Sequence, residues 1–483
     1  MSIIFVKEVR KMQMRRTKII CTMGPACRSK ENIEKLCLAG MNVARLNFSH
    51  GTHAEHKETI ENIKEVRKKL GLPIAILLDT KGPEYRIGAF KDKSVTVSEG
   101  DEFIFTTDDI EGDEKQVSVS YKKLPLEMHN GDIILVNDGL VSFEVTETGV
   151  NFVKCTVLTG GTLSDRKSMA FPGKVLNQVF LSEQDKEDLL FGIENDIDYV
   201  AASFVSNAEN ICDIKNFLKE NGGGDIDVIA KIENRAGVDN IREICEKCEG
   251  IMVARGDLGV EIPFKELPAV QKRLITTCRL MGRRIITATE MLESMTKNIR
   301  PTRAEISDVA NAVYDGTSAV MLSGETAVGV HPEKVVDTMS EICSEAERNI
   351  PYNELFFKSN FKIETNTDAV SYAACSMALT VGARAITVCS MTGKSARMVS
   401  RFRPDIDIIG FTTSEKAWRK LALSWGVLPV LSEEFSSAEV IFYSAAKATE
   451  NTLKLKKGDT IIIVGSTVSG KEGGTNDIRL QTI

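Results

Sequence analysis

The sequence contains no uninterrupted run of eighteen apolar residues, so it offers no segment long enough for a membrane-spanning helix. Its opening residues, MSIIFV followed by KEVRK, lack the apolar region and the small-residue cleavage site of a signal peptide. Basic residues are not in excess, because 61 lysines and arginines face 68 aspartates and glutamates and the net charge is -7. We therefore expect neither a membrane nor a nucleic acid among the partners of this chain.

The eleven cysteines form no paired framework either. Their number is odd, they are scattered, and most fall inside apolar segments, which indicates free thiols in a reducing compartment such as the cytoplasm. Only Cys245 and Cys248 have the spacing of metal ligands, and no second pair completes a zinc site. We interpret both as ordinary helix cysteines.

At 483 residues the chain is longer than one hydrophobic core usually supports, so several domains are expected. From residue 15 onward, short β-branched runs alternate with longer amphipathic segments, as in a parallel sheet with helical connections. Eight parallel strands close a (β/α)8 TIM barrel. The predicted strands span residues 17–22, 42–48, 74–79, 199–204, 228–233, 251–257, 284–289 and 319–324.

Two further units interrupt and follow the predicted barrel. Residues 88–168 carry alternating patterns such as KQVSVSY and GDIILV, which predict an inserted all-β domain with Gly and Pro at both edges. We interpret it as a β-barrel lid over the barrel mouth, the alternative being a passive decoration. The barrel then comprises residues 15–87 and 169–350, after an N-terminal extension over residues 1–14, and a C-terminal α/β domain covers residues 351–483.

Most of the predicted barrel strands begin apolar and end in charged or hydroxylic residues. The C-terminal strand ends of such a barrel form its catalytic face, so these side chains are expected to meet at one mouth. Unpaired charges on buried strands are costly, and a purely structural barrel does not need so many of them, which favours an enzyme. The residues concerned are Arg45, Asn47, Asp79, Ser203, Lys231, Glu233, Arg255, Asp257, Thr289 and Glu290.

Lys231 and Glu233 stand two residues apart and therefore point to the same side of one strand. Taken alone, this pair is compatible with an internal salt bridge as well as with catalysis. Asp257 stands where a strand meets a Gly-containing turn before a helix, a place where backbone N–H groups hold anions. Glu233 and Asp257 together offer two hard oxygen ligands from adjacent strands, which suits Mg²⁺.

The segment SMTGKSA, residues 390–396, lies between a predicted strand and a predicted helix of the C-terminal domain. Its hydroxyls, backbone amides and helix N-terminus predict a phosphate cradle, and an ordinary capping turn is the alternative. The Gly-rich segment 465–476 is a second candidate contact for the same ligand, although it lacks the spacing of a Walker motif. The candidate effector residues are Ser390, Thr392, Gly393, Lys394 and Ser395.

Eight blocks of the sequence, in the right order along the predicted barrel, resemble pyruvate kinase: TKIICTMGPAC, MNVARLNFSHG, LLDTKGPE, VIAKIENRAGVDNI, IMVARGDLGVEIP, TATEMLESM, PTRAEISDVANAV and AVMLSGETA. The resemblance runs from about residue 15 to the end of the chain. It implies transfer of a phosphoryl group from phosphoenolpyruvate to ADP, giving pyruvate and ATP at the last step of glycolysis. It also implies Mg²⁺ or Mn²⁺ and K⁺ as cofactors, a homotetramer, and a sugar phosphate as the candidate effector.

The same resemblance implies roles for individual residues. Arg45 and Lys231 face the transferring phosphoryl group, and the amides of Gly256 and Asp257 receive the substrate carboxylate. Lys231 is the first choice for stabilising the transition state, because positioned cations supply most of that stabilisation. Thr289 lies nearest the carbon that is protonated once an enolate remains. The implied substrate-binding residues are Arg45, Ser203, Lys231, Gly256, Asp257 and Thr289.

Metal and nucleotide contacts follow from the resemblance as well. Asn47, Arg86 and Lys167 match positions that reach the nucleotide phosphates across the lid hinge. Glu84 implies a K⁺-dependent enzyme, because relatives with lysine there place an ammonium near the ion; the alternative is that Glu84 merely pairs with Arg86. The implied metal ligands are Glu233 and Asp257 for Mg²⁺, and Asn47, Ser49, Asp79 and the carbonyl of Thr80 for K⁺.

Two positions depart from the family pattern, since Glu290 replaces a glutamine and Asn137 replaces an aspartate common in the lid. Two other functions are alternatives to phosphoryl transfer. Mg²⁺-dependent barrel lyases that cleave carbon–carbon bonds in oxo acids gather similar residues, but they lack the inserted β domain. A sugar-phosphate sensor with an inactive barrel is disfavoured because the residues expected at the mouth are all retained.

Overall fold

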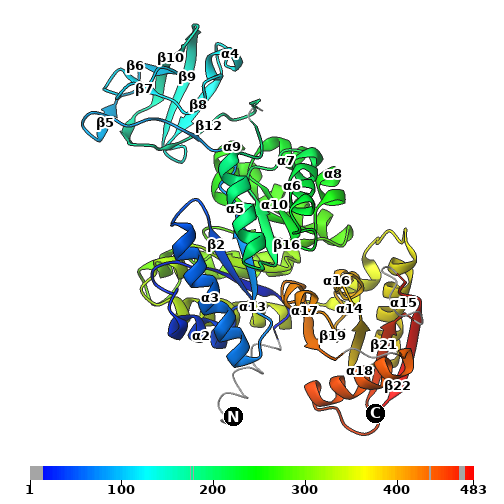
Figure 1. Cartoon of the computed structure of the whole chain (residues 1–483). Helices are drawn as coiled ribbons and strands as arrows, with labels where there is room; N and C mark the ends of the chain where they lie inside the picture. Colours follow the sequence, from blue (N-terminus) through cyan, green and yellow to red (C-terminus); the bar gives the residue numbers. More distant parts are fainter. Residues whose placement is uncertain (1–14, 175, 178, 434–436, 467–473) are drawn as a thin grey trace.

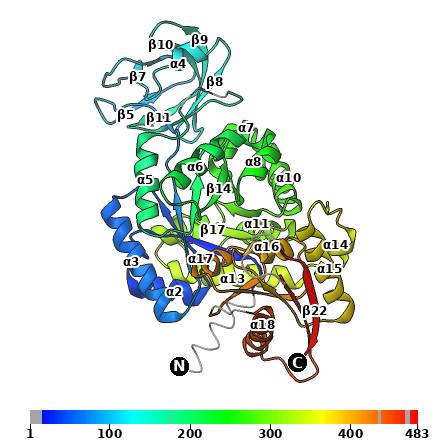
Figure 2. The ribbon, with the colours of Figure 1, turned by 45° about the vertical axis from the view of Figure 1, so that its right-hand side comes forward.

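The computed structural model describes residues 15–483 except 175, 178, 434–436 and 467–473 (Figure 1). The expected N-terminal extension, residues 1–14, therefore lies outside the described residues. Figures 1 and 2 show a central barrel with a small β unit projecting from one end and an α/β unit packed at the other. No helix in the described part of the chain has the length and apolar character to cross a bilayer.

Eight parallel strands close the barrel in the order β1-β17-β16-β15-β14-β13-β3-β2, which confirms the predicted (β/α)8 fold. Their residues are almost all buried, as expected for strands that pack on both faces. The strands are β1 (Lys18–Thr22), β2 (Val43–Asn47), β3 (Ala75–Asp79), β13 (Tyr199–Ala202), β14 (Asp227–Ile232), β15 (Gly250–Ala254), β16 (Arg284–Ala288) and β17 (Ala319–Leu322).

Several strands end earlier than the sequence pattern predicted. β13 stops at Ala202, and Phe204, which adopts a φ of 56°, turns the chain away two residues later. β15 stops at Ala254, and helix α9 (Arg255–Glu261) starts at the next residue. Arg255 and Asp257 therefore stand in the first turn of a helix instead of at the end of a strand, because the β-branched run ends before them.

Helices cover the outside of the barrel, and local capping explains where several begin. Thr52, Ser182 and Thr302 each form a capping box with an acidic residue three positions later. The larger helices are α2 (Lys30–Ala39), α3 (His53–Leu70), α5 (Glu183–Glu194), α6 (Ala208–Glu220), α10 (Leu267–Leu280), α11 (Arg303–Asp315) and α13 (Pro332–Arg348). Shorter helices are α7 (Arg235–Asp239), α8 (Ile241–Lys247) and α12 (Gly324–Ala327), with 3-10 turns η1 (Phe264–Glu266) and η2 (Glu293–Thr296).

The inserted β unit leaves the barrel after β3 and forms a seven-stranded sheet in the order β4-β12-β8-β9-β10-β6-β7, with a two-stranded sheet β11-β5. A bridge between Ile87 and Val119, directly after β4 and β7, joins the two ends of the larger sheet and so closes it on itself. The strands are β4 (Tyr85–Arg86), β5 (Ser94–Val97), β6 (Glu102–Thr106), β7 (Gln116–Ser118), β8 (Ile133–Val136), β9 (Val141–Thr148), β10 (Phe152–Thr159), β11 (Gly161–Ser164) and β12 (Ser168–Ala170), with helix α4 (Leu124–Glu127).

The C-terminal unit is a five-stranded sheet in the order β20-β19-β18-β21-β22, parallel except for β22. The sequence pattern had predicted three of these strands and missed β20, which contains a proline, and β22, which is rich in polar residues. The elements are α14 (Tyr352–Lys358), α15 (Asn366–Val381), β18 (Ala385–Cys389), α16 (Lys394–Arg401), β19 (Asp407–Thr412), α17 (Glu415–Leu421), β20 (Val427–Leu431), α18 (Ala438–Leu453), β21 (Thr460–Gly465) and β22 (Asp477–Thr482).

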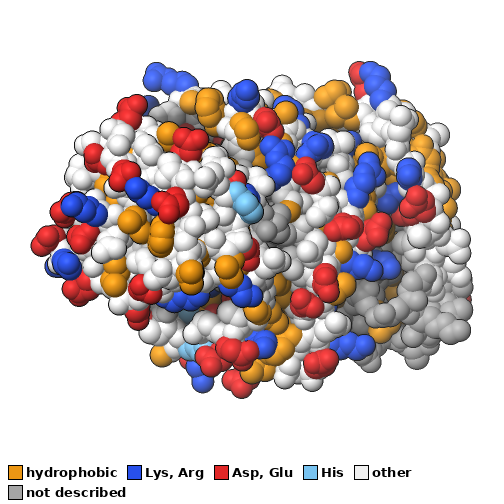
Figure 3. All heavy atoms as spheres, turned by 90° about the horizontal axis from the view of Figure 1, so that it is seen from above, with side chains coloured by type: hydrophobic (Ala, Val, Ile, Leu, Met, Phe, Trp, Pro, Cys, Tyr) orange, Lys and Arg blue, Asp and Glu red, His pale blue; other side chains and the backbone are white. Residues whose placement is uncertain are grey.

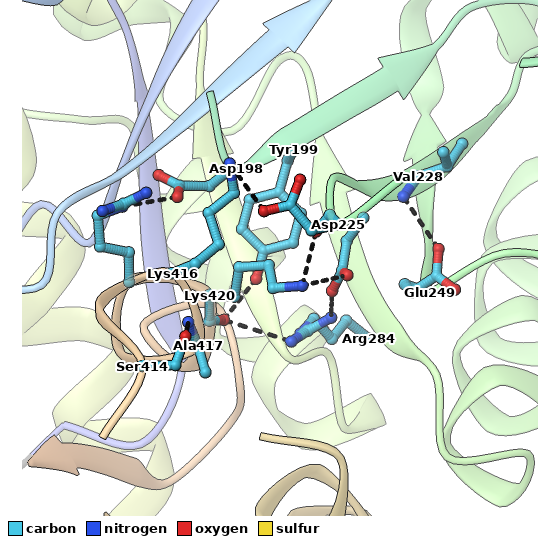
Figure 4. Close-up of polar contacts among 12 residues, drawn as sticks. Asp198, Tyr199, Asp225, Val228, Glu249, Arg284, Ser414, Lys416, Ala417 and Lys420 are labelled. Atoms are coloured by element: carbon cyan, nitrogen blue, oxygen red, sulfur yellow. Dashed lines mark hydrogen bonds and ion pairs between the residues drawn. The ribbon is translucent and has the colours of Figure 1, made fainter. Parts of the chain in front are cut away.

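Helix α17 of the C-terminal unit docks on the end of the barrel where the strands begin (Figure 4). Arg419 Nε lies 2.7 Å from Asp198 Oδ1, directly before β13, and Lys420 Nζ lies 2.7 Å from Asp227 Oδ1, the first residue of β14. The Tyr199 hydroxyl donates to the Lys420 carbonyl. The C-terminal unit therefore contacts the end of the barrel opposite the strand ends that carry the predicted site.

Candidate active site

Lys231, near the end of β14, stands at the centre of the polar mouth. Its Nζ donates to Ser203 Oγ at 2.7 Å and lies 3.0 Å from both Asp79 Oδ1 and Glu233 Oε1. All four side chains are buried. Burial lowers the pKa of Lys231, but the two carboxylates outweigh it, so the net pKa is raised and the ammonium stays charged. The predicted side-by-side arrangement of Lys231 and Glu233 is therefore present.

Asp79, the last residue of β3, links Lys231 to Arg45 on the neighbouring strand β2. Arg45 Nε lies 2.6 Å from Asp79 Oδ2, and an Arg45 Nη1 group donates to Thr22 Oγ1 at 2.9 Å. Burial opposes ionisation of Asp79, yet the charges of Lys231 and Arg45 hold its pKa below the ordinary value. Two cations are thus held at fixed positions by one buried carboxylate.

Glu233, directly after β14, and Asp257, in the first turn of α9, face each other. Glu233 Oε2 accepts a hydrogen bond from Phe204 N at 2.6 Å, whereas its Oε1 accepts none and has only the ion pair with Lys231. Burial and the nearby Asp257 carboxylate raise the pKa of Glu233 to about 7. Loss of solvation likewise raises the pKa of Asp257, which lies more exposed at the mouth. Two carboxyl groups with raised pKa values form a place where a cation would relieve repulsion.

Thr289 and Gly256 are joined at the mouth by a hydrogen bond. Gly256 N donates to Thr289 Oγ1 at 2.9 Å, and that hydroxyl donates to the Ala288 carbonyl at 2.6 Å. Thr289 and Glu290 both have positive φ angles, 68° and 52°. A β-branched residue rarely adopts that conformation, so the surrounding structure must enforce it.

Arg255 supplies part of that enforcement, and the sequence did not reveal this role. Its guanidinium donates to the carbonyls of Ala288, Thr289 and Glu290 and forms two bonds of 2.8 and 2.7 Å with the carboxylate of Asp308. Arg255 thus ties the first residue of α9 to the turn that carries Thr289. The sequence showed a charged residue near a strand end, but it did not show in which direction the Arg255 side chain points.

The connections between barrel and inserted β unit carry a second group of polar contacts. Arg86 Nη2 lies 2.5 Å from Glu84 Oε1, and Arg86 Nη1 donates to the Arg166 carbonyl oxygen at 2.7 Å. The Lys167 carbonyl accepts from Ile87 N at 3.0 Å. Arg86 and Lys167 therefore lie close together at the hinge, and the ion pair that was the alternative interpretation of Glu84 is formed.

A cavity of about 250 Å³ opens between the inserted β unit and the barrel, lined by residues that include Glu84, Asp138, Asp257 and Glu261. Glu261 Oε1, at the end of α9, accepts from Phe171 N at 3.3 Å on the returning connection. Burial raises the pKa of Glu261 to about 7. The sequence gave no signal for this contact.

The four implied K⁺ ligands lie at the ends of β2 and β3. Asn47 and Asp79 are partners in the strand register, and Asn47 Oδ1 accepts from Ser49 N at 3.2 Å. The Thr80 carbonyl accepts from Ser203 Oγ at 2.7 Å. Within the described residues, no cluster of three or more His, Cys, Asp or Glu side chains is arranged to hold a metal ion.

The predicted effector residues form the turn between β18 and α16. Gly393 is the N-cap of α16 with a φ of 77° and supplies no side-chain cap. Thr392 and Lys394 are exposed, while Ser395 is buried and its hydroxyl lies 2.5 Å from that of Thr475. Of the Gly-rich segment 465–476, residues 467–473 lie outside the described part of the chain.

Fixed cations beside paired carboxylates, at the C-terminal face of a (β/α)8 barrel, define an enzyme class that handles phosphorylated substrates. The comparisons agree. Residues 14–336 match the family model described as pyruvate kinase, barrel domain, and residues 368–481 match that of the pyruvate kinase alpha/beta domain. The chain belongs to the pyruvate kinase family, and it transfers the phosphoryl group of phosphoenolpyruvate to ADP.

Individual relatives give the same result. The pyruvate kinases of Staphylococcus haemolyticus and Staphylococcus aureus are each 44% identical over 473 residues, covering 97% of this chain and 81% of the relative. The crystal structure of a pyruvate kinase from Cryptosporidium parvum superposes with a TM-score of 0.93 at 37% identity, covering 98% of this chain and 97% of the other.

Proposed function

We propose that Lys231, Arg45 and Thr289 carry the phosphoryl transfer and that the inserted β unit closes over the reactants as a lid. The observation that carries this proposal is the Lys231 ammonium, held by three oxygens at a buried position beside two carboxylates. The phosphoryl transition state spreads negative charge over its equatorial oxygens. Cations that are already fixed, as Lys231 and Arg45 are, stabilise that charge without reorganising.

The carboxylates of Glu233 and Asp257 fit a divalent cation. A buried Glu233 oxygen without a hydrogen bond and a facing carboxylate form a hard-oxygen pair that leaves most of an octahedral shell to water and substrate. Mg²⁺ or Mn²⁺ bound by this pair would act as a Lewis acid on substrate oxygens. The buried position of Glu233 orients the pair, and Lys231 limits its negative charge.

The first turn of α9 suits the substrate carboxylate. The helix has no side-chain cap, so the N–H groups of Gly256 and Asp257 are available once Thr289 releases Gly256. If the substrate carboxylate replaces Thr289 Oγ1 as the acceptor for Gly256 N, the Thr289 hydroxyl becomes free beside the enolate that remains after transfer. We propose that Thr289 then donates or relays the proton to carbon, and that Ser203 keeps Lys231 in place.

K⁺, nucleotide and effector contacts complete the proposal. Asp79, at the junction of β2 and β3, provides the single carboxylate that suits a weakly hydrated univalent ion. The proposed K⁺ ligands are Asn47, Ser49, Asp79 and the Thr80 carbonyl, and the proposed nucleotide contacts are Asn47, Arg86 and Lys167. We assign a sugar phosphate to residues 390–395, because an uncapped helix start with exposed Thr392 and Lys394 favours phosphate. The working form would be a homotetramer in the cytoplasm.

The experiment is an assay of pyruvate formation from phosphoenolpyruvate and ADP in buffers that contain Mg²⁺ and K⁺, either one, or neither. We expect turnover only with both ions, and a shift of the substrate saturation curve by at least one sugar phosphate. Full turnover after removal of Mg²⁺ would contradict the assigned role of Glu233 and Asp257. An effector shift that persists in a Thr392→Ala, Ser395→Ala double variant would contradict the effector site.

A further inference from the structure

A small cavity of about 10 Å³ lies at the boundary between the barrel and the C-terminal unit, away from the mouth. It is enclosed by the end of α10, the start of β16 and the last turns of α16, together with Gly282, Trp425 and the hydroxyls of Ser318, Ser400 and Ser424. Among the described residues, no carboxylate lines it. Six arginines do: Arg279, Arg283, Arg284, Arg397, Arg401 and Arg403.

Only two of these arginines have an acidic partner. Arg284 Nη1 lies 2.8 Å from Asp227 Oδ2, and Arg401 Nη1 lies 3.1 Å from Asp368 Oδ1. In the part of the chain that the structure describes, the remaining four arginines of the cavity form no ion pair. Arginine does not give up its proton at neutral pH, so this excess of positive charge cannot be removed by deprotonation.

Arg403 is the most enclosed of the four, with 6% of its surface exposed. One Nη group donates to the Gly316 carbonyl at 2.9 Å and to Ser318 Oγ at 3.1 Å, and the guanidinium stacks 4.3 Å from the ring of Trp425. Its Nε and its other Nη atom are buried and have no hydrogen-bond partner. Donors of this kind are costly to bury unsatisfied, because each has lost its water.

Other cavity arginines repeat the same feature. The Nε atoms of Arg279 and Arg397 are also buried without a partner. Burial lowers the pKa of Arg403 to about 9, with repulsion from Arg279 as a further cause, and burial lowers the pKa of Arg397 to about 10, with repulsion from Arg284. The missing component in this environment is a negatively charged acceptor.

We propose that this cavity binds one monatomic anion, a halide such as chloride, which offsets part of the positive charge of the arginines and holds α16 against the barrel. The volume, close to that of one water molecule, excludes phosphate, sulfate, sugar phosphates and nucleotides, and the guanidinium groups of the lining supply donors to the lone pairs of a bound ion. Arg283 comes from the barrel and Arg397 from the C-terminal unit, so the ion would bridge both. Since α16 starts at Lys394 and the cavity is lined by Arg397, Ser400 and Arg401, the site is distinct from the turn of residues 390–395.

Thermal unfolding tests the proposal, with chloride and bromide each titrated against gluconate at constant ionic strength. Arg397→Met is the main variant, because the Arg397 side chain forms no hydrogen bond or ion pair with the residues that the structure describes. For the native protein, we expect at least one of the two halides to raise Tm in a saturable manner, on the order of 3 °C. In Arg397→Met that rise should be lost. In gluconate alone the variant should be as stable as the native protein or more so, because one like charge is gone.

Controls separate the proposal from general salt effects. Arg348→Met, at an exposed arginine outside the cavity lining, should respond to anions as the native protein does. Arg279→Met provides a second cavity variant should Arg397→Met fold poorly. Bromide soaked into crystals of the native protein should give an anomalous peak among the arginines. Equal anion responses in the native protein and both cavity variants would overturn the proposal, and so would a cavity without bromide.

Discussion

Lys231 shows how one side chain at the mouth is fixed by its neighbours. Two carboxylates and a hydroxyl surround its ammonium, so the group is charged and oriented before any substrate arrives. Such preorganisation costs nothing at the moment of reaction, whereas a flexible surface lysine would first lose side-chain entropy. Mutation of Lys231 is therefore expected to act mainly on the rate of the reaction.

Lys231→Met should lower kcat by about 10²- to 10³-fold or more, because a fixed cation is lost where the transition state gathers charge. Binding of Mn²⁺ should persist or tighten, since the ammonium no longer opposes a cation beside Glu233. Steady-state kinetics and a Mn²⁺ titration measure the two effects, with exposed Lys219→Met as the matched control. Near-normal kcat in Lys231→Met would remove Lys231 from the mechanism.

Thr289→Ala should slow proton exchange at the methyl group of pyruvate by about 10²-fold, because general acid–base groups contribute on that order. Phosphoryl transfer should slow much less, since the cations that stabilise it are untouched. Hydrogen exchange into pyruvate, followed by NMR beside turnover, separates the two steps. Thr289→Ser, which keeps the hydroxyl, should retain exchange. An equal loss in both steps for Thr289→Ala would assign the residue to positioning only.

At the residue scale, the sequence predicted which side chains stand near the mouth better than it predicted the directions in which they point. The two-residue spacing of Lys231 and Glu233 gave their common side correctly, because strand geometry alone decides it. It gave no sign that Asp79 would hold both Arg45 and Lys231, since that depends on how neighbouring strands are staggered. Arg255 was expected to point into the mouth, yet it turns to backbone carbonyls and Asp308.

Among the elements, α9 connects the reaction centre with the hinge of the inserted β unit. Its first turn presents Gly256 and Asp257, and its last residue, Glu261, accepts a hydrogen bond from Phe171 on the returning connection. The sequence pattern extended this strand to residue 257, into the first turn of the helix, because a Gly-containing turn after a strand does not reveal that a helix starts at once. The barrel strands, by contrast, were found because their apolar runs are long and regular.

Glu261→Gln should change how stability depends on pH. Burial raises the folded-state pKa of Glu261 to about 7, against about 4.3 for an unfolded glutamate. Its favourable contribution is therefore complete below about pH 4 and is lost as pH rises through 7. The glutamine variant should be more stable than the native protein at pH 8, by on the order of 1 kcal/mol, and not at pH 5. Thermal unfolding across this range, with exposed Glu209→Gln as control, measures it; parallel curves would contradict the prediction.

Glu84→Lys, at the start of the hinge, should remove the requirement for K⁺. The lysine ammonium would lie near the proposed univalent ion and take over its charge, while the ion pair with Arg86 would be lost. Turnover is measured in Na⁺-free buffer balanced with tetramethylammonium, with K⁺ added back. The native protein should need K⁺ and the variant should not. A native protein equally active without K⁺ would show that Glu84 serves only its pair with Arg86.

Across the whole molecule, the barrel separates two different surfaces. Its strand ends face the inserted β unit, and its strand starts face the C-terminal unit (Figures 1 and 2). On the outer face seen in Figure 3, acidic and basic side chains are intermixed. The three-unit plan was readable from the sequence because each unit has its own periodicity. The docking of α17 was not, since its cations resemble those of any solvated helix.

That docking depends on a buried ion pair, which makes it open to a double-mutant test. Asp198 is fully buried, and Arg419 is 4% exposed. Asp198 accepts from Ile76 N at 2.9 Å through its other oxygen, and burial raises its pKa despite the arginine. Removing one partner of such a pair leaves an uncompensated charge in the interior.

Arg419→Met should therefore destabilise the protein by about 3 kcal/mol, whereas Asp198→Asn should cost less, because Arg419 keeps its ion pair with Asp196 at 2.9 Å. The double variant should lose clearly less than the sum, since neither charge is then left alone. An exposed pair, Glu354 and Lys358, serves as control and should show coupling below about 1 kcal/mol. Denaturant unfolding, monitored by the fluorescence of the two tryptophans, Trp418 in α17 and Trp425, measures all four states of the cycle. Strict additivity at Asp198 and Arg419 would mean that apolar packing, and not this pair, holds the C-terminal unit to the barrel.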